Sequence, residues 1–242
     1  MINKKSKIII GVNFLSLMVV FFASYSLATA EFDQTFKNAV SQLSKERIPR
    51  PVVRSDDQGR ELVQNINFKI FGVTKEICNQ EKIEPQNCRW NIKVVRGSEF
   101  NAFATNSNQV IISSGLIDKV TYEEEIAFTL AHEIAHHLLD HIGKNRELVF
   151  IGAILGELVF GDLVAGVVLS SVVRQIGSRK YESSADAIAL RILSLAGYDL
   201  KKARYVLLRM AKMDKRLTSK FMQSHPSGIE RIVAFDTIVR KL

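Results

Sequence analysis

Proline and glycine are scarce in this chain of 242 residues, which has 4 Pro and 13 Gly and no low-complexity stretch. This composition excludes a collagen-like repeat and an extensively disordered chain. Hydrophobic residues make up 47% of the chain and charged residues 24%, close to the averages of globular proteins. The sequence therefore predicts a folded protein of one domain, or at most two, with enough chain to bury a core.

A nucleic-acid-binding pattern is also missing, although the formal net charge is +8. The basic residues are dispersed, and their largest cluster, residues 212–220, has no interleaved aromatic side chain. Three of the lysines lie in the first 30 residues, which contain no acid, so the remainder carries only +5. We therefore expect no nucleic-acid partner.

The first 30 residues have the order of a secretory signal peptide. Lysines precede an apolar run, Ile8–Phe22, and the segment ends in Ala-Thr-Ala at residues 28–30. A basic start, an apolar core and a small-x-small end are typical of a cleaved signal. The alternative is an uncleaved anchor, because Ile8–Leu27 is 20 residues long and can just span a bilayer. Both interpretations predict that residues 31–242 are exported as a single domain, and no cysteine near Ala30 indicates a lipoprotein.

The chain has only two cysteines, Cys78 and Cys88. An exported chain enters an oxidising compartment, where a disulfide persists. Closing this short loop stabilises a fold by roughly 2–3 kcal/mol in the chain-entropy model. The alternative, a zinc site, needs further soft ligands, and residues 79–87 contain no His. We predict a structural disulfide between the two cysteines.

Apolar spacing divides the remaining chain into a mixed first half and a helical second half. Mixed three- and four-residue spacing predicts surface helices over Glu31–Arg47 and Asp57–Cys78. Weak alternation predicts a strand over Trp90–Val95, and Phe100–Thr105 and Gln109–Ser113 flank a turn-forming Asn-Ser-Asn. That arrangement favours a hairpin.

The strongest chemical pattern lies on a helix predicted to begin near Thr121. His132 and His136 are four positions apart, so both rings project from one helix face and can bind one Zn²⁺. Glu133 then lies beside the open position of the metal, where a water would be held. The alternative is a solvated polar face, but ionisable groups among apolar neighbours are costly without partners. The pattern predicts one catalytic Zn²⁺ per chain.

A third ligand is available downstream, where Glu182 and Asp186 are also four positions apart on a predicted helix. Glu182 can complete the zinc site, and Asp186 can accept a hydrogen bond from the distal nitrogen of a ligating histidine. The alternative is a helix N-terminus with favourable acids in its first turn.

Four segments in a fixed order are more specific together than any one motif. They are residues 101–104 (Asn-Ala-Phe-Ala) with the strand after them, residues 132–141, residues 182–186, and residues 224–226 (Ser-His-Pro) with Arg231. In this combination the chain resembles the gluzincin zinc metallopeptidases that include HtpX, BepA and the CAAX prenyl proteases. It is closest in type to the periplasmic BepA-like members, but the C-terminal repeats of such members are not expected here. The resemblance implies a mainly helical α+β fold of zincin type, in which the edge strand of a small sheet flanks the zinc helix.

The resemblance also implies a role for each site residue. The implied zinc ligands are His132, His136 and Glu182. The implied catalytic residues are Glu133, which assists attack by a zinc-bound water, and His225, which stabilises the oxyanion. The implied supporting residues are Asp186, Arg231 and His141, and the implied binding site for an extended peptide, by strand addition, is Asn101, Ala102, Phe103 and Ala104. His137 is rotated by about 100° from its neighbour on the helix and is predicted to have a structural or surface role.

Leu148–Val173 is the longest apolar stretch outside the N-terminus, with acids only at Glu157 and Asp162. Central acids are costly in a membrane span, and glycines at four- and five-residue spacing suit close helix packing. We predict a helical hairpin at about residues 148–173, buried or facing a membrane; a true span is the alternative. An exposed hairpin of this kind can dock on a lipid surface or on a partner.

The resemblance implies a zinc-dependent endopeptidase in the periplasm or an equivalent compartment, with protein or peptide substrates, in particular misfolded or misassembled envelope proteins. The alternative is a chaperone-like or binding module of the same fold whose zinc site is latent. Glu133 argues against that alternative, since metal binding alone needs no general base.

Overall fold

The computed structural model describes residues 41–43, 45–144, 180–214 and 229–242. The chain divides into two units, Met1–Glu46 and Arg47–Leu242. In the first unit, residues 41–43 are helical. The predicted signal peptide (residues 1–30), the apolar hairpin (residues 148–173) and His225 lie outside the described residues, as does most of the predicted helix 31–47.

Helix α2, Asp56–Gln80, is the first long element of the second unit and matches the predicted helix 57–78. It begins with a capping box, in which the Ser55 side chain accepts from the Gln58 backbone and the Gln58 side chain accepts from the Ser55 backbone. Such a cap satisfies N–H groups that the first turn leaves unpaired. The core face is apolar and buried, and it includes Val63, Ile66 and Ile70.

Three strands form the sheet, in the order β1-β3-β2. Strand β1, Asn91–Val95, runs parallel to β3, Gln109–Ser113, and β2, Ala102–Ala104, runs antiparallel to β3. The predicted hairpin is therefore present, and Asn108 in its turn adopts a φ of 56°. A positive φ is tolerated by Asn more readily than by most residues, which explains why this tripeptide turns the chain.

The predicted disulfide joins Cys78, near the end of α2, to Cys88, just before β1. Within the loop it closes, the carbonyl oxygen of Gln86 accepts a hydrogen bond from the Asn108 side chain at 2.8 Å. The bridge therefore anchors a loop that also supports the β2–β3 turn.

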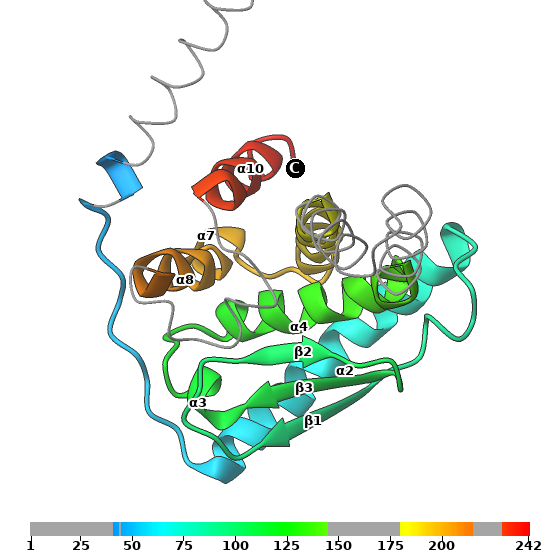
Figure 1. Cartoon of the computed structure of the whole chain (residues 1–242), viewed down its shortest axis with the longest axis horizontal. Helices are drawn as coiled ribbons and strands as arrows, with labels where there is room; N and C mark the ends of the chain where they lie inside the picture. The colour runs from blue at the N-terminus through cyan, green and yellow to red at the C-terminus, as the bar shows by residue number, and fades with distance from the viewer. Residues whose placement is uncertain (1–40, 44, 145–179, 215–228) are drawn as a thin grey trace, which may run out of the picture. The chain divides into compact units, whose positions relative to one another are not determined.

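Helix α4, Glu123–Leu138, is the central helix of the described structure. Figure 1 shows it between the sheet, with β2 nearest to it, and the C-terminal helices. The helix starts slightly later than the sequence predicted, with Tyr122 at the N-cap position. The reason is Glu125, whose carboxylate accepts from the backbone N–H groups of Thr121 and Tyr122.

The described residues of the C-terminal half are mainly helical, as predicted. Residues 180–195 form one helix, followed by α7, Leu200–Ala203, α8, Tyr205–Asp214, and α10, Ile229–Val239. Arg209 of α8 forms a buried ion pair with Glu125 of α4 at 2.6 Å. In the described ranges, no helix combines the length and apolar character that crossing a membrane requires. The fold is mainly helical α+β, and the edge strand β2 flanks α4, as the resemblance implied.

Candidate metal centre and active site

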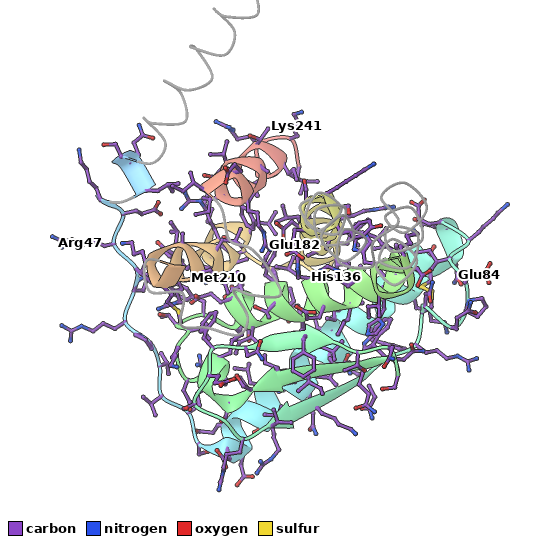
Figure 2. The ribbon with its side chains drawn as sticks, viewed as in Figure 1. Arg47, Glu84, His136, Glu182, Met210 and Lys241 are labelled. Carbon is purple, nitrogen blue, oxygen red and sulfur yellow. A yellow bond between two sulfur atoms is a disulfide. The ribbon has the colours of Figure 1, made fainter. Side chains whose placement is uncertain are left out.

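Two helices bring three metal-binding side chains to one buried point. On α4, the Nε2 atoms of His132 and His136 are 3.1 Å apart. From the helix of residues 180–195, the Glu182 carboxylate lies 3.3 Å from each of these nitrogens. Figure 2 labels Glu182 next to His136 across the two helices. All three residues are buried, with exposed fractions of 8% or less.

These residues fit a zinc ion in chemistry and in spacing. Two imidazoles and one carboxylate are ligands that zinc takes in catalytic sites. Ligand atoms at about 2.0–2.1 Å from a tetrahedral ion are separated from one another by about 3.3 Å. The observed separations of 3.1 and 3.3 Å have that size.

The electrostatics of the site also favour a cation. Burial alone disfavours a charged imidazole, but Glu182 and Asp186 outweigh that penalty and raise the pKa of His132 to about 10. Opposite charges at this range stabilise the charged form. The same negative charges of Glu182 and Asp186 also attract a divalent cation.

Behind His132, two buried side chains form a second layer. The Nδ1 atom of His132 lies 2.9 Å from Oδ1 of Asp186, an ion-pair contact that leaves Nε2 facing the centre. Arg231 of α10 donates to both oxygens of Asp186 and lies 3.1 Å from Glu182. Burial opposes the charge on Asp186, but Arg231 and His132 outweigh it and hold the pKa of this carboxyl below its usual value.

Behind His136, the partner is His141. The Nδ1 atoms of the two rings are 3.1 Å apart, and Nε2 of His141 is 3.3 Å from the Ser184 hydroxyl. Burial, with the charges of His136 and Lys144, lowers the pKa of His141 to about 3. The ring is thus neutral and carries one donor and one acceptor. We assign the acceptor to Nδ1, toward His136, and the donor to Nε2, toward Ser184.

Sequence reasoning gave no role to Tyr181 or Ser184, which both support His141. The Tyr181 ring stacks on His141 with centroids 4.4 Å apart and an interplanar angle of 21°. Tyr181 and Ser184 are three positions apart, so they share a helix face. This spacing is the feature of the sequence that could have indicated their shared role. His137 was assigned a structural or surface role, and its exposed fraction of 5% shows that the surface alternative is wrong.

Glu133 faces the edge strand of the sheet. The backbone N–H of Ala104 donates to its Oε2 at 2.8 Å. Within the predicted substrate strand, Ala102 is buried, Phe103 is 37% exposed, and the carbonyl of Asn101 accepts from the Ser113 backbone. The structure thus brings β2, Glu133 and the His-His-Glu cluster together. The remaining predicted residue, His225, is outside the described residues.

A family model and several known proteins match this chain over more than half of its length. The family model of peptidase family M48 matches residues 69–239. The mitochondrial metalloendopeptidase OMA1 of Saccharomyces cerevisiae is 28% identical over 182 residues, 70% of this chain and 53% of that protein. The metalloprotease LoiP of Escherichia coli is 26% identical over 152 residues, 58% of this chain and 59% of its own length. A putative beta-barrel assembly-enhancing protease of Vibrio cholerae is 25% identical over 223 residues, 85% of this chain and 44% of that protein. The chain thus spans 44–59% of the length of these relatives.

Proposed function

The chain belongs to peptidase family M48, and from this premise we propose that it is a zinc metalloendopeptidase that cleaves exported proteins at the centre formed by His132, His136 and Glu182. The observation that carries the proposal is the convergence of three buried ligand atoms within 4.8 Å of one another. Glu133 lies on the same helix, one residue after His132, where a general base is needed.

We propose that His132, His136 and Glu182 hold one zinc ion per chain. Zinc bound there supplies a Lewis acid that polarises the scissile carbonyl and lowers the pKa of water toward neutrality. Glu133 accepts a proton from the attacking water at its carboxylate and later donates that proton to the leaving amine. Asp186 and His141 fix the orientation and tautomers of the two histidine rings. His225 is proposed to stabilise the oxyanion.

The substrate is proposed to bind as an extended strand along β2. Strand addition relies on main-chain hydrogen bonds, which give affinity without a strict sequence requirement. Segments that are extended and accessible occur in unfolded rather than native proteins. We therefore propose misfolded or misassembled envelope proteins as the substrate class. The name of the Vibrio cholerae relative, a putative beta-barrel assembly-enhancing protease, supports this choice.

The location follows from the N-terminal pattern. We propose that residues 1–30 direct export to the periplasm or an equivalent space, and that residues 31–242 act there as one domain. The apolar stretch 148–173 is proposed to associate the domain with a membrane surface.

The test compares the purified protein with Glu133→Gln, and uses Glu123→Gln in the first turn of the same helix as a matched control. Zinc is measured by elemental analysis, and cleavage is measured on casein as an unfolded substrate. We expect one zinc in all three proteins and chelator-sensitive cleavage only in the unaltered protein and in Glu123→Gln. Zinc without cleavage in the unaltered protein would favour a latent site, and absence of zinc would contradict the proposed ligands.

A further inference from the structure

We propose that the backbone N–H of Ala104 is a positioning group that holds the Glu133 carboxylate in place for proton transfer. This inference rests on the proposed role of Glu133 as the general base. It assigns a second task to strand β2, whose edge opposite β3 is also the proposed substrate-binding edge.

The hydrogen bond joins two different parts of the fold. Ala104 is the last residue of β2, and its N–H donates to Oε2 of Glu133 at 2.8 Å. The Glu133 side chain is buried, with an exposed fraction of 1%. A hydrogen bond from a neutral donor to a buried carboxylate is among the stronger kinds in proteins, and it also restricts the rotamers of a flexible side chain.

The pairing of β2 with β3 shows that this N–H has no part in the sheet. The Thr105 N–H donates to the Gln109 carbonyl, and the Asn101 carbonyl accepts from the Ser113 N–H. Backbone groups in an antiparallel pair alternate between facing the partner and facing away. Residues 102 and 104 therefore direct their N–H and C=O groups away from β3. Removing the Ala104 N–H leaves the ladder of the sheet intact.

Two consequences follow for the reaction. With Oε2 held by the strand, the carboxylate keeps one orientation relative to His132 and His136 when it accepts the proton. An extended substrate can then pair with the N–H and C=O of Ala102 and with the C=O of Ala104, while the Ala104 N–H stays on Glu133. Any shift of β2 would move the base and the substrate together.

The sharpest test replaces Ala104 by lactic acid, which turns the Phe103–Ala104 peptide bond into an ester and deletes the N–H while keeping the side chain. Ala104→Pro deletes the same N–H by ordinary mutagenesis, and proline is tolerated where an edge strand directs its N–H outward. We expect kcat on casein to fall about 10- to 100-fold, the size expected for a hydrogen bond to a charged group. KM and zinc content are expected to stay unchanged, and the melting temperature is expected to fall modestly, because the buried Glu133 carboxylate loses a hydrogen-bond donor.

The same lactic acid replacement at Ala102 is the matched comparison, because it deletes the other outward N–H of β2. It is expected to raise KM and leave kcat unchanged. An Ala104 ester with raised KM and normal kcat would show that this N–H binds substrate, and would overturn the inference. Normal kinetics, or loss of zinc or of the fold, would also overturn it. If Glu133→Gln cleaves as fast as the unaltered protein, the proposed function itself fails.

Discussion

Arg231 donates two hydrogen bonds to the Asp186 carboxylate, from Nε at 2.8 Å and from Nη2 at 2.7 Å. Asp186 in turn contacts Nδ1 of His132 at an ion-pair distance of 2.9 Å. The C-terminal helix α10 is thereby connected to the proposed metal centre through buried charges. The centre depends on helix packing as well as on its ligands.

Replacing Arg231 by methionine is expected to destabilise the protein by about 3–5 kcal/mol, because Asp186 and Glu182 lose a buried positive partner. Urea unfolding measures the change. Arg240→Met in the exposed last turn beyond α10 is the control and should cost less than about 0.5 kcal/mol. Equal effects of the two substitutions would contradict a buried ion-pair role for Arg231.

Asp186→Asn is expected to weaken zinc binding about 10- to 100-fold, the usual effect of losing the carboxylate that orients a ligating histidine. The amide can present N–H₂ instead of oxygen to Nδ1 of His132 and then favours the wrong tautomer. Competition against a chelator measures the affinity. The control is Asp57→Asn on the exposed surface of α2, which should have no effect on zinc affinity. If Asp186→Asn also leaves zinc affinity unchanged, Asp186 does not support the site.

His141→Phe tests the support behind the second histidine. Phenylalanine can keep the stacking on Tyr181 but cannot accept a hydrogen bond from Nδ1 of His136. We expect zinc affinity to fall about 10-fold. Ser184→Ala removes only the more distant hydrogen bond and should cause a smaller loss. If Ser184→Ala weakens zinc binding as much as His141→Phe, the assigned order of the relay is wrong.

The disulfide is expected to contribute to stability and not to metal binding. The double substitution Cys78→Ser with Cys88→Ser should lower the free energy of unfolding by roughly 2–3 kcal/mol, because the unfolded chain regains loop entropy. Zinc content should stay at its unaltered value, since the bridge joins the end of α2 to the start of β1. Urea unfolding and elemental analysis measure the two quantities, and a loss of zinc would contradict the separation.

Tyr198 is expected to make stability fall at alkaline pH. Burial and the charges of Glu123 and Glu124 raise the pKa of its hydroxyl to about 12. The folded state favours the neutral hydroxyl. Its contribution to the free energy of unfolding is therefore complete below the ordinary tyrosine pKa near 10 and is lost as the pH rises through the pKa of the folded protein. Urea unfolding from pH 9 to 12 should show a steeper decline for the unaltered protein than for Tyr198→Phe. Parallel declines would count against the shift.

The sequence by itself determined the local geometry of this protein. The apolar spacing predicts helix α2, the Asn-Ser-Asn tripeptide predicts the β2–β3 turn, and the four-residue spacing places His132 and His136 on one face of a helix. These relations hold within one element, where the helical and strand periods set which side chains are neighbours. The pairing of Cys78 with Cys88 was predictable for a different reason, since two cysteines allow a single disulfide within the chain.

Only the tertiary structure decided which elements meet. The approach of Glu182 to the histidines, of Arg231 to Asp186, and of the Ala104 N–H to Glu133 depends on how helices and sheet pack, which no local period encodes. The late start of α4 has the same origin, because its first turn is held by the Glu125 carboxylate, itself paired with Arg209 of a distant helix. A buried charge is costly without a partner, and here the partners come from other elements of the fold. The supporting contacts of the site therefore depend on packing and electrostatics and could not be predicted from the sequence.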